Sequence, residues 1–210
     1  MQPMRTGLLL SGGMDSLSVA WWKRPDIGIT IDYGQLAAEA EITASRAICE
    51  RLGIEHHILH IDCRDVGSGD MAGMPPDFNA PASDWWPYRN QMLITLAAMK
   101  AISLGLKKLL LGTVKSDGSH KDGTPEFLHA MNALLSMQEG NLQVIAPAIA
   151  MSTAELVKHA DVPSHLLAWA HSCHKANVAC GDCRGCNKYF EVLREIGDEM
   201  DQSGQPTTAI

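Results

Sequence analysis

The first pattern that could do chemistry is the hexapeptide Ser-Gly-Gly-Met-Asp-Ser at residues 11–16. It lies between a short apolar run, predicted as a buried strand, and a stretch with helical periodicity. Two glycines let the backbone approach an oxyanion closely, and the amides and dipole of a helix start favour negative charge. The pattern therefore predicts a phosphate-binding loop made by Ser11, Gly12, Gly13, Met14, Asp15 and Ser16. The simpler alternative is a tight turn followed by a helix with an acidic first turn.

Two common phosphate-binding signatures are absent from this loop. It lacks the Lys-Ser/Thr ending of the nucleoside-triphosphate P-loop, and it lacks the G-x-G-x-x-G dinucleotide fingerprint. The sequence therefore supports neither a P-loop kinase nor a dehydrogenase.

The second pattern is a group of four cysteines near the C-terminus, Cys173, Cys180, Cys183 and Cys186. Four thiolates are the ligand set of tetrahedral Zn²⁺, and the C-x2-C spacing places pairs of sulfurs around one ion. A closed site of this kind is structural, because a catalytic zinc keeps an open position. Three of the four cysteines also resemble an iron–sulfur spacing, which leaves a cluster as the alternative metal centre.

Composition limits the class of protein. The chain has 210 residues, which suits one domain with a small appendage. Its 17 Lys and Arg against 24 Asp and Glu give a net charge of -7, which opposes sequence-independent binding of nucleic acid. The first residues do not resemble a signal peptide, and no apolar run reaches membrane-spanning length, so we expect a cytoplasmic protein without membrane contact.

Alternating apolar runs and helical stretches predict how these residues are positioned. Strands are expected at 8–10, 27–31, 54–61, 108–111 and 143–145, with helices at 16–23, 37–52, 89–104, from 125, and at 152–159. This order predicts an α/β fold with a doubly wound, mostly parallel, five-stranded Rossmann-like sheet. We divide the chain into an α/β domain at 1–165 and a metal-binding segment with a C-terminal helix, packed on the same domain, at 166–210.

Several segments together resemble the 7-cyano-7-deazaguanine synthase family of the N-type ATP pyrophosphatases, also called the PP-loop superfamily. Besides the loop and the cysteines, they are Asp32-Tyr33-Gly34-Gln35, Arg89-Asn90 and residues 112–127. The resemblance covers nearly the whole chain. Each segment alone is weak, but their order and spacing are specific.

The resemblance implies an ATP-dependent ligase of queuosine biosynthesis. Members of the family are described as adenylating 7-carboxy-7-deazaguanine and converting it with ammonia, through the amide, to the nitrile, with release of AMP and pyrophosphate. It further implies structural Zn²⁺, Mg²⁺ bound with ATP, and a homodimer. The partners expected from it are ATP and a small deazapurine substrate.

The resemblance also implies roles for individual residues. Asp32 and Gly112 join the loop in binding ATP and Mg²⁺, and Asp15, Ser16 and Arg89 are expected to be catalytic. The residues expected to bind the substrate are Arg89, Asn90, Lys115, Asp117 and Asp122. For Asp117 and Asp122 the alternative is a solvated acidic loop, and for Lys115 it is an exposed lysine.

The chain departs from the family pattern at three places. His174 stands where an aromatic residue is usual, residues 187–189 replace an Arg, and Thr153 replaces a Lys. Less positive charge beside the site leaves a second hypothesis, a divergent paralogue that stops at the adenylate or amide, or passes the acyl group to an amine of a protein. Two further alternatives are a tRNA-modifying PP-loop enzyme and a zinc-stabilised module that only binds nucleotide.

Overall fold

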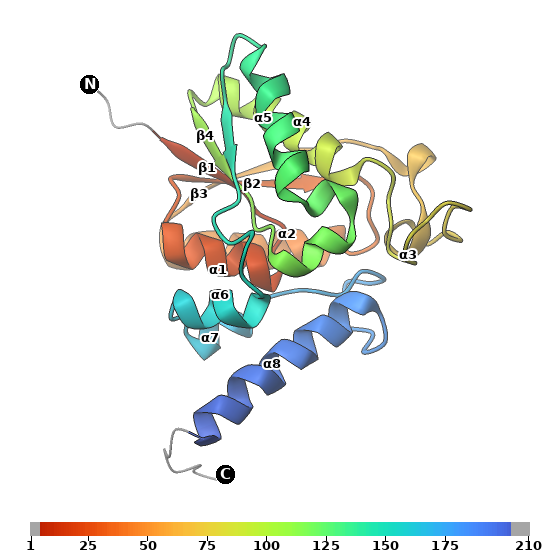
Figure 1. Ribbon diagram of the computed structural model, residues 1–210, viewed down its shortest axis with the longest axis vertical. Helices are drawn as coiled ribbons and strands as arrows, with labels where there is room; N and C mark the ends of the chain where they lie inside the picture. Colours follow the sequence, from red (N-terminus) through yellow and green to blue (C-terminus); the bar gives the residue numbers. More distant parts are fainter. Residues whose placement is uncertain (1–4, 203–210) are drawn as a thin grey trace.

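A five-stranded parallel sheet lies at the centre of the molecule (Figure 1). The computed structural model describes residues 5–202. The strands are β1 (Thr6–Leu9), β2 (Ile27–Asp32), β3 (Glu55–His60), β4 (Lys108–Leu110) and β5 (Gln143–Ile145). Their order in the sheet is β3-β2-β1-β4-β5, and every neighbouring pair is parallel. The predicted doubly wound fold is confirmed.

Helices cover both faces of this sheet (Figure 1). The core on one face is built with α1 (Met14–Lys23), α2 (Ala38–Leu52) and α6 (Thr153–His159), and the core on the other with α4 (Arg89–Ser103) and α5 (Pro125–Ser136). Leu8 and Leu10 point into the first core and Leu9 packs against the second. This alternation follows from the two-residue period of a strand, and it explains why β1 is apolar on both sides.

Local signals set the ends of several helices as the sequence predicts. Gly53 ends α2 with a φ of 68°, which a glycine adopts without steric cost. At the start of α6, Ser152 and Glu155 form a reciprocal capping box, with N···O distances of 3.1 and 2.7 Å. Pro125 occupies the first turn of α5, where no amide is needed.

Short helices lie in the connections between the main strands and helices. They are η1 (Arg64–Val66), α3 (Gly69–Ala72), η2 (Lys115–Ser119), η3 (Lys121–Gly123) and α7 (Ser164–Leu167). The long connection between β3 and α4 is anchored by Trp86, which is 2% exposed and packs edge-on against Tyr33. Burying this aromatic ring holds the connection against the carboxyl ends of the strands.

The C-terminal segment adds its residues to the core of the α/β unit. Leu166 and Leu167 of α7 and Val192 of α8 (Arg184–Gln202) are buried in the same cluster as α1 and α6. Helix α8 runs away from the sheet toward the C-terminus (Figure 1). The division at residue 165 stays a prediction, and residues 203–210 of the predicted segment lie outside the described part. Between residues 5 and 202, no helix is long and apolar enough to cross a membrane.

The order of the strands reverses at β1, whose neighbours are β2 and β4. Ligands of doubly wound sheets bind at the carboxyl ends of the strands beside such a reversal. The loop after β1 and the segment after β4 meet there. A Cβ placed on Gly112 would lie 2.8 Å from both Cα and N of Ser16, so only a glycine permits this approach.

We expect Gly112→Ala to lower the free energy of unfolding by about 1–3 kcal/mol, because its methyl group overlaps backbone atoms rather than a flexible side chain. Chemical denaturation measures this change. Gly118→Ala is the control, since a Cβ at Gly118 has no neighbour within 4 Å. Equal stability of the two variants would contradict the close packing at Gly112.

Candidate active site

A cavity of about 670 Å³ opens at the carboxyl end of the sheet. Its wall combines the loop after β1, the connection before α4, the first turn of α4, the segment after β4 and the C-terminal segment. It is therefore assembled from parts of the chain far apart in sequence. Of the predicted site residues, those that line it are Ser11, Gly13, Met14, Asp15, Ser16, Arg89, Asn90, Gly112, Asp117, Asp122 and Cys173.

The loop after β1 packs against α2 and is hydrogen-bonded to the C-terminal segment. Gly12 has a φ of +73°, and a Cβ there would lie 2.7 Å from the carbonyl oxygen of Glu41 in α2. Its own carbonyl accepts a hydrogen bond from the His171 amide at 2.9 Å. Gly12 thus shapes the loop without lining the cavity.

The start of α1 is open toward a ligand. Gly13 is the N-cap residue and has no side chain, so no side chain caps the amides of the first turn. The Ser11 and Ser16 hydroxyls lie 3.1 Å apart, and Ser16 Oγ donates to the Gly13 carbonyl at 3.1 Å. Uncapped amides at a helix start are a suitable site for an anion.

A partly buried ion pair lies next to these amides. Lys188 of α8 places Nζ 2.8 Å from Oδ2 of Asp15 and 3.6 Å from Oδ1 of Asp117. Burial raises the pKa of Asp15, and the Lys188 ammonium opposes that rise. Burial lowers the pKa of Lys188, but Asp15 and Asp117 together hold it above its usual value. Lys188 therefore stays charged at neutral pH.

Lys188 supplies a positive charge at one of the places where the chain departs from the family pattern. Residues 187–189 lack the usual Arg, yet the structure supplies a cation there from Lys188. At Thr153 the difference remains, because its buried hydroxyl lies beside the Asp15 carboxylate but carries no charge. Sequence reasoning had missed Lys188, although its place just after the last cysteine was the available signal.

Arg89 and Asn90 open α4 and face the same cavity. Burial lowers the pKa of Arg89, but the acidic groups around it, Tyr33 and Asp122 first among them, hold it above its usual value. The Asn90 amide donates to Asp122 Oδ2 at 3.3 Å, and Asn90 Nδ2 donates to the Asp122 carbonyl at 3.2 Å. Asp122 therefore caps α4 and fixes the position of its first turn.

A second charged cluster was not predicted. The carboxylate of Asp84, which is buried, lies 3.2 Å from Arg184 and 3.3 Å from His174 Nδ1. Burial raises the pKa of Asp84, yet His174 and Arg184 outweigh it and hold that pKa well below its usual range. The cluster ties the connection before α4 to the cysteine segment. No local sequence signal relates residues 100 positions apart.

Asp32 and Lys115, predicted to bind ATP and substrate, also lie away from the cavity wall. The Asp32 carboxylate accepts from the Gly34 amide at 3.0 Å and lies 3.2 Å from His60. Lys115 is exposed at the start of η2. Their predicted roles in binding remain predictions.

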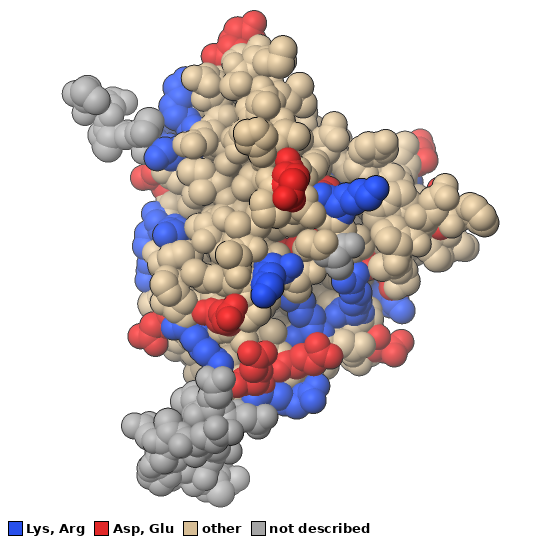
Figure 2. All heavy atoms as spheres, in the orientation of Figure 1, with Lys and Arg blue, Asp and Glu red and all other residues tan. Residues whose placement is uncertain are grey.

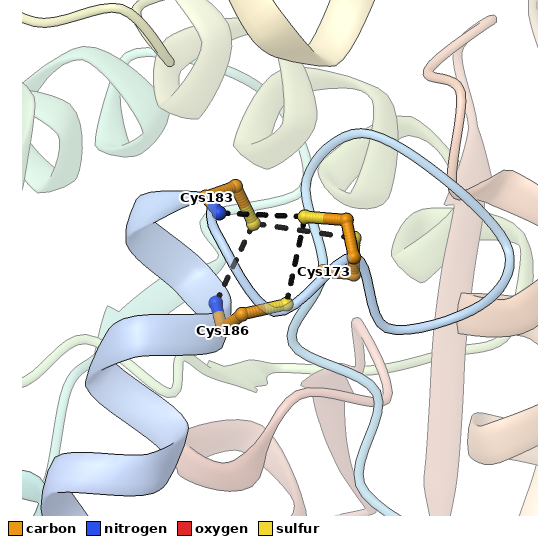
Figure 3. Close-up of side chains that lie close together, drawn as sticks. Cys173, Cys183 and Cys186 are labelled. Atoms are coloured by element: carbon orange, nitrogen blue, oxygen red, sulfur yellow. Dashed lines mark hydrogen bonds between the residues drawn. The ribbon is translucent and has the colours of Figure 1, made fainter.

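The four predicted cysteines converge before and within the first turn of α8. All four sulfurs lie within 4.8 Å of one another. Figure 3 shows Cys173, from the preceding loop, pointing toward Cys183 and Cys186. The Sγ–Sγ distance is 4.0 Å between Cys173 and Cys183 and 3.9 Å between Cys180 and Cys186. Such a group of thiols can hold a metal ion.

The family model described as queuosine biosynthesis protein QueC matches residues 6–197. This chain belongs to the QueC family. It is 31% identical to the 7-cyano-7-deazaguanine synthase of Desulforudis audaxviator, over 92% of this chain and 98% of that protein. It is 28% identical to the synthase of Methanosarcina barkeri, over 92% of this chain and 95% of that protein.

Solved structures show the same fold at lower identity. The U34-tRNA thiolase NcsA of Methanococcus maripaludis, with its 4Fe-4S cluster, has a TM-score of 0.54 and 18% identity, over 97% of this chain and 68% of that chain. The NMN synthetase of Francisella tularensis has a TM-score of 0.50 and 16% identity, over 98% and 80%. At this identity the likeness of these proteins to the QueC chain extends to the fold alone.

We expect Cys183→Ser to lower the bound metal from about one ion per chain toward zero and to lower the melting temperature with it, because three thiolates hold the ion poorly. Elemental analysis and thermal unfolding of the same samples measure both. Cys63→Ser, outside the cluster, is the control and should retain the metal. A stable Cys183→Ser protein with its full metal content would rule out this site.

Proposed function

We propose that this chain is an ATP-dependent ligase that makes 7-cyano-7-deazaguanine from 7-carboxy-7-deazaguanine and ammonia, through the amide, and releases AMP and pyrophosphate. The observation that carries the proposal is one cavity in which uncapped amides, Lys188 and Arg89 all meet. The names of the relatives in the QueC family support the same reaction.

The chemistry requires two anions to be brought together. An oxygen of the substrate carboxylate attacks the α-phosphorus of ATP, and the bond to pyrophosphate breaks. The first-turn amides of α1 would bind the departing pyrophosphate, and Lys188 would turn from Asp15 toward its charge. Arg89 would hold the substrate carboxylate. Such donors, fixed before the reaction, stabilise charge where it develops.

Asp15 fits a role in holding Mg²⁺. Its Oδ1 atom is buried, and beyond Lys188 only the neutral hydroxyl of Thr153 interacts with the carboxylate as a hydrogen-bond donor in residues 5–202. Carboxylate oxygens are the protein ligands that Mg²⁺ prefers. When bound, the ion neutralises phosphate charge, and Asp15 would position it beside the loop.

The acidic residues after β4 could bind the guanine-like ring of the substrate. A guanine-like ring presents neighbouring N–H donors, and a carboxylate accepts two of them. Asp122 is fixed through Asn90, and Asp117 Oδ2 is fixed by the Val114 amide at 3.0 Å. We assign these residues to recognition of the deazaguanine ring.

The spacing of the cysteines favours a single Zn²⁺ ion. With Zn–S bonds of about 2.3 Å, a tetrahedral site has sulfurs about 3.8 Å apart. The observed 3.9 and 4.0 Å match this value. A four-iron cluster binds each cysteine through a different iron and needs wider spacing. Four thiolates close the site, so the ion would stabilise the segment that carries Lys188.

A small-molecule acceptor fits the charges of the molecule better than nucleic acid. The net charge is -7, and on the face in Figure 2 the basic and acidic side chains are interspersed. Ammonia is the acceptor we propose, and an amine of a protein is the alternative outcome. A homodimer, expected from the family, is part of the same proposal.

Incubation with ATP, Mg²⁺, ammonium and 7-carboxy-7-deazaguanine tests the proposal. We expect substrate-dependent pyrophosphate release, with the amide and then the nitrile seen by mass spectrometry. No substrate-dependent release would leave a nucleotide-binding module, and release dependent on tRNA would favour a tRNA-modifying enzyme. A product that forms only with an added protein would identify a protein acceptor.

We expect Asp15→Ala to lower turnover at least about 100-fold, since a charge-stabilising group at the transition state is lost. Thermal unfolding should show that the variant still folds. Asp65→Ala, an exposed carboxylate away from the cavity, serves as the control. Activity of Asp15→Ala equal to that of the control would refute the assigned loop.

A further inference from the structure

Glu41 lies in the first turn of α2 and lines the cavity, but none of the roles above uses it. Its Oε2 atom accepts a hydrogen bond from Gln35 Nε2 at 2.8 Å. In the described part of the chain, no hydrogen bond to its Oε1 atom is found. One oxygen is thus held in place, and the other is available to a reactant.

Gln35 is the residue that positions Glu41. Its buried amide is fully used: Nε2 also donates to the Ile31 carbonyl at 3.1 Å, and Oε1 accepts from the Tyr33 amide at 2.8 Å. These bonds attach the Glu41 carboxylate to the end of β2. The side chain is therefore oriented before any ligand enters.

The aspartates that line the cavity already have partners. Asp15 pairs with Lys188, and Asp84 pairs with Arg184. Asp117 and Asp122 each accept a backbone amide. Glu41 differs from Asp15, Asp84 and Asp117, which each form an ion pair with a lysine or an arginine, because its hydrogen-bonded partner is the neutral side-chain amide of Gln35.

Charge and burial around Glu41 keep its protonated and ionised forms close in energy. Burial raises the pKa of Glu41 to about 7, which the Gln35 bond and the Arg89 guanidinium partly oppose and Asp32 reinforces. The charged or titratable groups that face it are Arg89 from α4 and Asp32 and Tyr33 from the end of β2. A base near the working pH is effective in proton transfer.

Formation of the C–N bond requires such a proton acceptor. An amine nitrogen, of ammonia or a larger acceptor, attacks the carbonyl carbon of the acyl adenylate, the C–N bond forms, and AMP leaves with the electron pair of the C–O bond. The nitrogen must then lose a proton. We propose that Oε1 of Glu41 takes this proton and passes it to solvent when product leaves. This inference rests on the proposed function and adds a catalytic base to it.

The proposal separates the two halves of the reaction. Adenylation needs no proton acceptor, because the attacking carboxylate is already ionised. The C–N step needs ionised Glu41, so its rate should fall about tenfold for each pH unit below the pKa of Glu41 and level off above it. Experiments at a constant concentration of free ammonia exclude the titration of ammonium itself.

Glu41→Gln tests whether adenylation and C–N bond formation differ in their need for a base. The new side chain cannot take a proton, but its amide oxygen can still accept the hydrogen bond from Gln35. We expect substrate-dependent exchange of labelled pyrophosphate into ATP to stay within about threefold of the unmodified chain. Amide formation in a single turnover should fall at least about 100-fold and lose its dependence on pH near neutrality. Glu50→Gln, an exposed position on the same helix, is the matched control.

Each outcome decides the matter. Equal loss of exchange and amide formation in a folded Glu41→Gln protein would overturn the role of Glu41 and leave the ligase intact. Amide formation at the full rate in that variant would also overturn the role of Glu41 and leave the ligase intact. If Glu41→Gln does not fold, Glu41→Asp replaces it, together with the pH profile of amide formation by the unmodified chain. A rate of amide formation that does not change between pH 6 and 8 overturns the inference. Absence of exchange in the unmodified chain would remove both proposals.

Discussion

Amides in the first turn of α1 have no side-chain cap, and they face a cavity rather than bulk solvent. Leaving backbone donors unpaired in a partly buried place costs stability unless a ligand or water satisfies them. Gly12 packs against α2, and Gly112 packs against the backbone of Ser16. These close contacts on two sides fix the conformation of the loop. The surrounding structure keeps these donors available, and the other polar groups of the site are arranged around them.

Lys188 balances the negative charge beside these amides. Its ammonium neutralises Asp15, and the same lysine lines the cavity wall. The cysteine group stands immediately before this lysine in sequence and at the base of its helix in space. A structural metal would therefore act on the reaction indirectly, by fixing the start of α8.

The carboxylates of the cavity differ by environment rather than by residue type. Arg184 and His174 hold the pKa of Asp84 well below its usual range, whereas at Glu41, which is partly buried next to a neutral amide, desolvation raises the pKa to about 7. Separating the proton affinities of neighbouring acids is how one site can hold fixed charges and a proton acceptor together.

The sequence by itself determined the strands, the main helices, the loop and the cysteine group. Each of these depends on neighbours in the chain: apolar periodicity, a glycine at a positive φ, a capping box, or four thiols within a short segment. The tertiary structure alone decided that Lys188 meets Asp15, that Asp84 meets Arg184, and that Gln35 turns Glu41 into the cavity. The first two contacts join residues 173 and 100 positions apart, so their energies exist only after folding has brought these segments to the same edge of the sheet. Glu41 faces a cavity only because distant segments of the chain form the other walls.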